Sequence, residues 1–220
     1  MSRVFARYFI ALGSTALLFI SACGGGGSSS VISPDISSTG SLAETSTDEL
    51  CTPVGSLLDC ELDIGGLDRR FKIYEPSNLS PDVALPLLFN FHGYGSNADQ
   101  QLIYGDFRSL ADEETFILVV PQGSLLEGTT HWNSDSEFTS KSTADDLGFV
   151  SGMIDELETR YNIDNTRVYA AGMSNGGAMS LYLACSLCVQ ISAVASVTGF
   201  MSADLLSNCG AVNPTSVILI

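Results

Sequence analysis

The chain has 220 residues, of which 45% are hydrophobic and 15% are charged, and nine basic and 25 acidic residues give a formal net charge of −16. This length suits one α/β domain with a sizeable core, and the composition is typical of a globular protein rather than a disordered one. A surface this acidic repels phosphate backbones and anionic lipid headgroups, which argues against a nucleic-acid partner.

Residues 1–22 are typical of an export signal. A short basic start precedes an interrupted apolar run at residues 8–20, which is too short to predict a membrane span. Residues 20–23, Ile-Ser-Ala-Cys, resemble the lipobox of bacterial lipoproteins. This resemblance implies acylation of Cys23 and anchoring to the outer membrane by lipid alone, with simple secretion as the alternative.

Residues 23–48 contain a Gly-Gly-Gly-Gly-Ser-Ser-Ser stretch and a Ser/Thr-rich tract without apolar periodicity. Such a segment cannot bury enough surface to order itself, so it is predicted to be a flexible tether. One folded domain is predicted from residue 49, close to Cys51, to residue 220.

The apolar segments of this domain predict alternating strands and helices. Strands are predicted at residues 71–76, 85–91, 116–120, 168–171, 191–197 and 216–220. Helices are predicted at residues 101–111, from a capping-box-like start at 143–146 to Tyr161, and at 178–185. This alternation predicts an α/β fold with a mostly parallel sheet covered by helices on both faces.

The functional interpretation depends on residues 172–176, Gly-Met-Ser-Asn-Gly, which lie between a predicted strand and a predicted helix. The bare G-x-S-x-G pattern arises easily by chance, but in this context it is typical of a nucleophile elbow. The tight turn projects the Ser174 Oγ from the sheet, while Gly172 and Gly176 let the backbones approach closely. The sequence therefore predicts Ser174 as the nucleophile of an acyl-transfer reaction.

An acyl-transfer serine needs backbone donors that point at the tetrahedral oxyanion. Asn175 follows the nucleophile and is predicted to supply one N–H. The predicted strand at 85–91 ends in His92-Gly93-Tyr94, and the Tyr94 N–H is predicted to be the second donor. His92 is predicted to hold this loop by hydrogen bonds rather than to act as the base. The alternative is that this loop is a turn without a chemical role.

Several motifs, in the same order, resemble those of the polyhydroxybutyrate depolymerase and feruloyl esterase group of secreted α/β-hydrolases. They lie at residues 88–94, 132–133, 145–149, 161–164, 167–169, 172–177 and 183–185. The resemblance implies an α/β-hydrolase fold, Ser174 as nucleophile, the Tyr94 and Asn175 amides as oxyanion donors, and a structural or cleft-lining part for Trp132 and Asp146. It implies a carboxylic-ester substrate, either a hydroxyalkanoate polyester or a hydroxycinnamoyl or acetyl ester of a plant polysaccharide, and no cofactor or metal.

The sequence departs from this family in the rest of the triad. The resemblance implies an acid and then a histidine after the nucleophile, yet His92 and His131 both precede Ser174. Asp204 is the one acid after Ser174, and it lies on too early a connection to be expected in the triad. His131, beside Trp132, is predicted to lie at the surface or rim, where only an unusual arrangement would make it the base.

The acid and the histidine are therefore expected after Ile220, which makes the domain a truncated one. The alternative is a surface lipoprotein without catalytic activity, or an inactive fragment, that retains the hydrolase scaffold.

Five cysteines remain when Cys23 is set aside, and an exported chain is expected to form disulfides. The predicted pairs are Cys51–Cys60 and Cys185–Cys209, which leaves Cys188 unpaired. Cys185 and Cys188 form a C-x-x-C motif, but no second pair stands at metal spacing and no histidine is close in sequence. These observations argue against a metal or redox site.

Overall fold

The computed structural model describes residues 50–134, 142–209 and 215–220. The expected signal peptide at 1–22, the expected lipidation site at Cys23 and the expected tether at 23–48 lie outside these ranges. Within the ranges, no helix is both long enough and apolar enough to cross a membrane.

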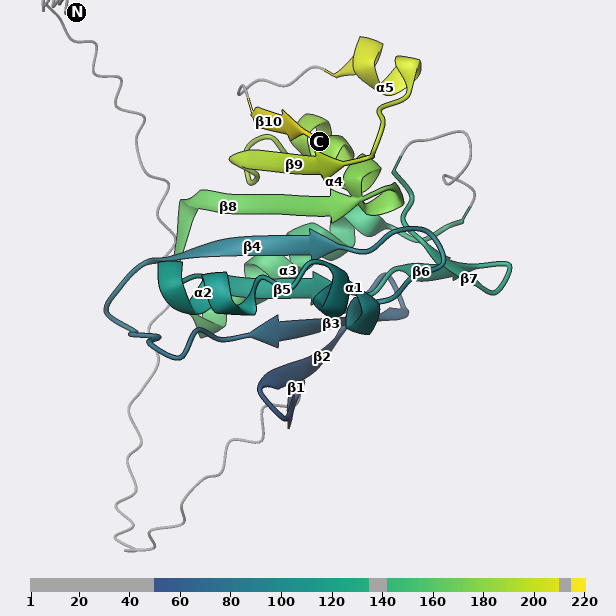
Figure 1. Ribbon diagram of the computed structural model, residues 1–220. Coiled ribbons are helices and arrows are strands. Elements are labelled where there is room, and N and C mark those ends of the chain that lie inside the picture. The colour runs from purple at the N-terminus through teal and green to yellow at the C-terminus, as the bar shows by residue number, and fades with distance from the viewer. Residues whose placement is uncertain (1–49, 135–141, 210–214) are drawn as a thin grey trace, which may run out of the picture. The chain divides into compact units, whose positions relative to one another are not determined.

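The main element is an eight-stranded sheet in the order β1-β2-β3-β5-β4-β8-β9-β10 (Figure 1). Strands β4, β5, β8, β9 and β10 are parallel to one another, whereas β1, β2 and β3 run antiparallel to their neighbours. The sheet strands are β1 Cys51–Val54, β2 Leu57–Ile64, β3 Leu67–Tyr74, β4 Leu85–Phe91, β5 Ile117–Pro121, β8 Ile163–Met173, β9 Ala193–Val197 and β10 Ser216–Leu219. A small hairpin is formed by β6 Ser124–Leu126 and β7 Thr129–His131.

The strand register places residues far apart in the sequence in one row across the sheet. The row consists of Ile73, Val119, Phe89, Ala170, Val194 and Val217. Because these five parallel strands leave the row in the same direction, the loops after β4, β5, β8 and β9 meet at one edge of the sheet. The antiparallel strand β3 reaches the same edge with its N-terminal residues. This carboxyl edge of the parallel strands carries the candidate site.

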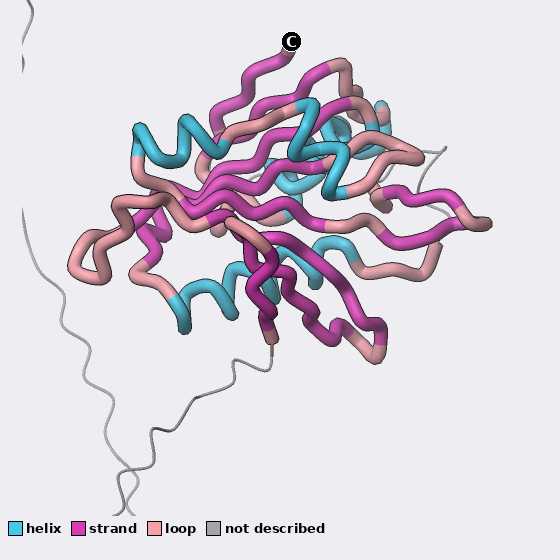
Figure 2. The backbone as a smooth tube through the Cα atoms, turned by 60° about the horizontal axis from the view of Figure 1, so that its bottom comes forward, coloured by secondary structure: helices cyan, strands magenta, loops and turns pink. Residues whose placement is uncertain are grey.

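Helices cover both faces of the sheet, as Figures 1 and 2 show. The helices are α1 Ala98–Tyr104, α2 Arg108–Glu114, α3 Asp146–Arg160, α4 Asn175–Ser186 and α5 Ala203–Asn208. Alternate residues of β5 point to opposite faces: Leu118 and Val120 pack with α1 and α2, whereas Ile117 and Val119 belong to the larger cluster with α3 and α4. The predicted fold class, a mostly parallel sheet with helices on both faces, is confirmed.

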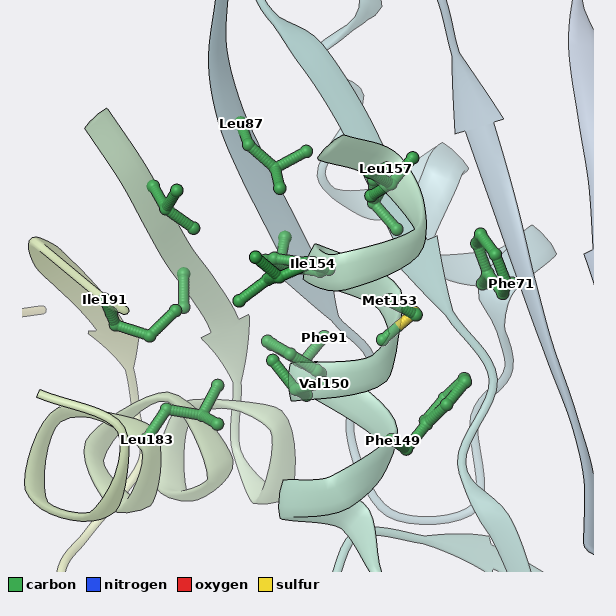
Figure 3. Packing of buried hydrophobic residues seen from close by; sticks show 14 of the residues in the cluster. Phe71, Leu87, Phe91, Phe149, Val150, Met153, Ile154, Leu157, Leu183 and Ile191 are labelled. Carbon is green, nitrogen blue, oxygen red and sulfur yellow. The ribbon is translucent and has the colours of Figure 1, made fainter. Parts of the chain in front are cut away.

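Helix α3 provides the centre of the larger cluster. Its apolar residues recur at helical spacing, and Figure 3 shows Val150 and Ile154 directed at Leu87 and Phe91 of β4. All four side chains are at most 2% exposed. This packing fixes α3 against the sheet and thereby places the N-terminus of α3 beside the candidate site.

Two expectations about helices were wrong in detail, and four strands were missed. The helix expected at 101–111 is two helices, because α1 ends at Tyr104 and the next residue, Gly105, donates its N–H to the Gln101 carbonyl. Helix α3 begins at Asp146 rather than Thr143, because the Asp145 side chain caps the Gly148 N–H. Strands β1, β2, β6 and β7 were not predicted. Each pair forms an antiparallel hairpin or ladder whose sequence lacks a long apolar run.

Both predicted disulfides are confirmed. Cys51–Cys60 joins paired residues of β1 and β2, and Cys185–Cys209 joins the end of α4 to the residue after α5. Cys188 is free and half-buried.

The edge strand β10 exposes apolar side chains, and we expect this edge to promote self-association. Val217, Ile218 and Leu219 are 47%, 61% and 68% exposed. Ile218→Lys is expected to reduce light scattering of the concentrated chain, because a lysine on an exposed edge opposes edge-to-edge pairing. Lys72→Arg, on an interior strand, is the control. Equal scattering by wild type and Ile218→Lys would contradict the expectation.

Candidate active site

Ser174 occupies the tight turn between β8 and α4. Its backbone has φ 55° and ψ −115°, a conformation that costs an L-residue free energy, and its side chain is exposed. The Ser174 N–H donates to the Val197 carbonyl at 2.8 Å, which ties the turn to β9. A reactive side chain is thus held out from the sheet at the N-terminus of a helix, where the dipole favours negative charge.

The glycines around Ser174 are required by close backbone contacts. A Cβ at Gly172 would lie 2.4 Å from the Gly176 carbonyl carbon and oxygen. A Cβ at Gly176 would lie 2.2 Å from the Phe91 oxygen and 2.6 Å from the His92 oxygen. The start of α4 therefore lies directly against the end of β4, which brings the loop after β4 next to the serine.

That loop contains Gly93 and Tyr94. A Cβ placed on Gly93 would be 3.6 Å from the Ser174 Cβ, so the two residues are in contact distance. The loop is held by hydrogen bonds from the Gly95 N–H to Thr130 O at 2.8 Å and from the Ser96 N–H to Gly93 O at 3.1 Å. Among the described residues, the Tyr94 N–H has no acceptor. It is geometrically available to a ligand oxygen beside Ser174.

Asn175 is the first residue of α4, so its backbone N–H has no acceptor within the helix. Its buried side chain is fixed by the loop that contains Trp132. The Trp132 N–H donates to Asn175 Oδ1 at 2.8 Å, and Asn175 Nδ2 donates to the Trp132 carbonyl at 3.1 Å. This reciprocal pair holds the start of α4 in one orientation.

Trp132 also connects this loop to the one after β4. Its indole is fully buried, and Nε1 donates to the His92 carbonyl at 2.9 Å. The ring stands edge-on to Phe91 at a centroid distance of 5.1 Å. Trp132 therefore contacts both expected oxyanion segments, at His92 and at Asn175. It does not line an open cleft.

His92 is buried and uses both ring nitrogens within the fold. The Gly123 N–H donates to Nε2 at 2.9 Å, so the proton is on Nδ1, which donates to Gly93 O at 2.8 Å. Burial lowers the pKa of His92, while the hydrogen bond to Gly93 acts in the opposite direction. A neutral, doubly hydrogen-bonded imidazole holds the loop and is not placed to accept a proton from Ser174.

The burial of neutral His92 makes stability depend on pH. The folded-state pKa lies below the ordinary value of 6.5, so the unfolded chain binds more protons in mildly acidic solution. The stability gained by burying His92 as a neutral imidazole is fully present above the pKa that His92 has in the unfolded chain. It is lost as the pH falls below that value. We expect the melting temperature to fall from about pH 8 to about pH 5, and His92→Gln to flatten this dependence. An unchanged slope in His92→Gln would show that other groups cause it.

Asp146 and Arg69 form a buried ion pair that contacts the loop containing Trp132 and Asn133. Arg69 Nη2 lies 2.6 Å from Asp146 Oδ1, with side chains 3% and 0% exposed. The second carboxyl oxygen accepts the Asn133 N–H at 2.7 Å, and the guanidinium lies 4.1 Å from the centre of the Phe149 ring. Burial raises the pKa of Asp146, and Arg69 and the Asn133 N–H oppose that rise. The pair anchors the loop that orients Asn175.

The expectation that His131 lies at the surface or rim was wrong, because its side chain is fully buried. Nδ1 is 3.1 Å from Ser124 O and Nε2 is 3.2 Å from Asn133 Oδ1. Asn133 Nδ2 donates to Ala144 O at 2.7 Å, which fixes its Oδ1 toward the histidine. Both partners are acceptors, so a neutral His131 donates to only one of them, and among the described residues neither ring nitrogen contacts Ser174. Asp204 lies in the first turn of α5.

Two residues that contribute to this arrangement were not singled out from the sequence: Arg69 and Gly123. Asn133 was part of the motif at 132–133, but no role was predicted for it. Arg69 had a detectable signal, since it is a basic residue within a strand of a strongly acidic chain. Gly123 had none, because its need for a glycine comes from the His131 carbonyl, 2.5 Å from a Cβ placed there. Among the described residues, no group of three His, Cys, Asp or Glu side chains could hold a metal ion.

Three named esterases are similar to this chain in sequence. A bifunctional acetylxylan esterase/xylanase, XynS20E, of Neocallimastix patriciarum is 34% identical over 134 residues, which are 61% of this chain and 18% of the relative. Feruloyl esterase B of Piromyces equi is 32% identical over 127 residues, 58% of this chain and 23% of the relative. Feruloyl esterase D of Neurospora crassa is 28% identical over 162 residues, 68% and 50% of the two chains. The chain thus spans between 18% and 50% of the length of these relatives.

Solved structures share the fold. An acetyl xylan esterase from Aspergillus awamori superposes with a TM-score of 0.57 at 19% identity, covering 69% of this chain and 54% of that one. A thermostable esterase superposes with a TM-score of 0.57 at 18% identity, covering 70% and 44%. The fold is therefore that of the α/β-hydrolases. The model of the family described as "Esterase PHB depolymerase" matches residues 71–215, and the chain belongs to this family.

Proposed function

We propose that this chain carries the nucleophile and the oxyanion hole of a serine esterase that cleaves carboxylic esters through an acyl-enzyme on Ser174. The observation that carries the proposal is the exposed Ser174 at φ 55°, at the N-terminus of α4 and in contact distance of Gly93. Strain of this kind persists where the surrounding structure imposes it, and it is concentrated at functional sites.

In the proposed reaction, Ser174 Oγ attacks the ester carbonyl while a base removes its proton. The oxygen of the tetrahedral intermediate accepts hydrogen bonds from the backbone N–H groups of Tyr94 and Asn175. Collapse of the intermediate breaks the bond to the alcohol, which leaves with a proton. Water then hydrolyses the acyl-enzyme by the same steps and frees Ser174.

We assign the supporting residues by their contacts. Gly172 and Gly176 allow the tight turn, Gly93 and His92 hold the loop that carries Tyr94, and Trp132 joins that loop to Asn175. Asp146 fixes the Trp132 loop through Asn133. Because His92 and His131 are engaged through both ring nitrogens, we propose that the general base and its acid partner come from residues after Ile220.

The names of the relatives favour acyl esters of plant cell-wall polysaccharides over polyesters as substrates, because acetylxylan and feruloyl esterases are among the matches. No cofactor is invoked for this route.

We further propose export, with a lipid anchor on Cys23 and a tether at 23–48, or release outside the cell. Incorporation of labelled palmitate tests the anchor: label in wild type and none in Cys23→Ala is expected, and equal label in both would refute it.

Hydrolysis of p-nitrophenyl acetate and methyl ferulate by the full-length protein tests the proposed esterase activity. Ser174→Ala is expected to lower kcat by about 10⁴-fold or more, whereas Ser207→Ala, at an exposed serine of α5, retains the wild-type rate. Activity that survives in Ser174→Ala would refute the assignment.

A second candidate is a surface lipoprotein without catalytic activity that uses the hydrolase scaffold for binding. The engagement of both histidines favours it. This alternative predicts that the full-length protein hydrolyses neither ester at any pH.

A further inference from the structure

His131 is a buried histidine that the proposed reaction does not use. Its side chain is 0% exposed, so it is too deeply buried for a water molecule to reach either ring nitrogen. Each nitrogen faces a protein atom instead, with Nδ1 3.1 Å from Ser124 O and Nε2 3.2 Å from Asn133 Oδ1. The Ser124 carbonyl can only accept a hydrogen bond. The protonation state of His131 therefore depends on which end of the Asn133 amide faces the ring.

Three hydrogen bonds fix the orientation of the Asn133 side chain. Nδ2 lies 3.0 Å from Ser142 O, 2.9 Å from Ser142 Oγ and 2.7 Å from Ala144 O. Two of these partners are backbone carbonyls, which accept and cannot donate, so the group that faces them is the amino group. The other amide atom, Oδ1, is then the one that faces His131 Nε2. His131 thus lies between two acceptors in a site closed to water.

A neutral imidazole carries one ring proton and can satisfy only one of these two acceptors. At the other contact, a nitrogen lone pair would face an oxygen lone pair at 3.1 or 3.2 Å. An imidazolium donates to both oxygens. His92 is the contrasting case, because the Gly123 N–H donates to its Nε2 and that nitrogen must be unprotonated. The contacts therefore favour different protonation states for the two histidines of the chain.

The charges near His131 favour a buried cation. Asp146 of α3 interacts with it electrostatically and is joined to it through Asn133, whose N–H donates to Asp146 Oδ2 at 2.7 Å. Arg69 of β3 is paired with Asp146 at 2.6 Å, and the neutral His92 adds no charge. Burial raises the pKa of Asp146, while Arg69, the Asn133 N–H and His131 oppose that rise. The formal net charge of −16 also favours binding of a proton.

We propose that His131 is an imidazolium in the folded protein and that, by donating to Ser124 and Asn133 together, it positions the oxyanion hole. The next residue, Trp132, makes the reciprocal hydrogen bonds that hold Asn175. His131 fixes Trp132 from one side in the sequence, and Asn133 fixes it from the other. The positioning role rests on the proposed esterase function, whereas the charge state of His131 does not.

Nitrogen-15 NMR of the full chain tests the charge state, with His92 as the internal reference. We expect two proton-bearing ring nitrogens in His131 and one in His92 at about pH 7. Because the chain has two histidines, the spectrum of either His92→Gln or His131→Gln is sufficient to assign both rings. A single proton-bearing nitrogen in His131 would overturn the proposal.

The kinetics of the full-length protein test the positioning role. His131→Gln, which is neutral, is expected to lower kcat for p-nitrophenyl acetate about ten-fold and to change KM less than about two-fold, because oxyanion donors act mainly in the transition state. Leu125→Ala changes an exposed side chain of β6 in the same hairpin, and this control should keep the wild-type kcat.

Thermal melting of each variant establishes that it is folded. A wild-type kcat in folded His131→Gln, or an equal loss in Leu125→Ala, would overturn the positioning role. If wild type hydrolyses no ester, the esterase function is refuted, and the NMR result still decides the charge state of His131.

Discussion

Replacing Asp146 with asparagine is expected to destabilise the fold by about 3–5 kcal/mol, because it leaves the buried charge of Arg69 without its partner. The pair is 2.6 Å apart with side chains 3% and 0% exposed, so water cannot replace the lost carboxylate. Asn133 also loses its anionic acceptor. Urea unfolding, read as the change in midpoint at constant slope, measures the effect.

The surface provides the matched control. Arg70 and Glu61 are paired at 3.0 Å with side chains 73% and 45% exposed, and Glu61→Gln is expected to cost at most about 1 kcal/mol. The double variant Arg69→Met/Asp146→Leu removes both charges and should be more stable than Asp146→Asn. If Asp146→Asn and Glu61→Gln are equally stable, the buried pair does not anchor the Trp132 loop.

Gly176→Ala is expected to prevent normal folding or to destabilise the chain by at least about 3 kcal/mol, because the new Cβ meets immobile backbone. The Phe91 and His92 oxygens would lie 2.2 and 2.6 Å away, and both belong to the central strand β4 or its end. Relief requires α4 to move away from β4, which would displace Ser174 from the loop that carries Tyr94. Thermal melting and far-UV circular dichroism detect the loss.

Gly93→Ala is the comparison for this substitution. Its Cβ would lie 3.4 Å from Met173 O and 3.6 Å from the Ser174 Cβ, which are ordinary contacts. We expect this variant to fold, with a change in melting temperature much smaller than that of Gly176→Ala. A similar fall in melting temperature in both variants would mean that the loop after β4 is equally rigid at Gly93. It would also mean that the close contact at Gly176 has no larger effect on stability.

Much of the fold could be predicted from the sequence because its signals are local. The buried strand β4 is a continuous apolar run, and the predicted bounds 85–91 are those of the structure. The helical spacing of Phe149, Val150, Met153 and Ile154 identified the buried face of α3. The elbow was recognisable because a short motif sits between such a strand and such a helix.

The rest depends on contacts between distant segments, which local patterns do not contain. Strand order brings Arg69 of β3 to Asp146 of α3, 77 positions later, and nothing near either residue indicates its partner. His131 was placed at the surface because it lies in a polar segment, yet β6 and β7 pair around it and bury it. Strand order likewise determines which loops share an edge with Ser174.

The most direct test of the account is covalent labelling of the chain with a fluorophosphonate probe, with and without added imidazole as an external base. Peptide mass spectrometry then identifies the modified residue. We predict an adduct on Ser174, faster labelling in imidazole because neither histidine of the chain is free to act, and no adduct in Ser174→Ala. A chain with both disulfides intact that gives no adduct at any imidazole concentration, or an adduct on another serine, would contradict the assignment of Ser174 as the nucleophile.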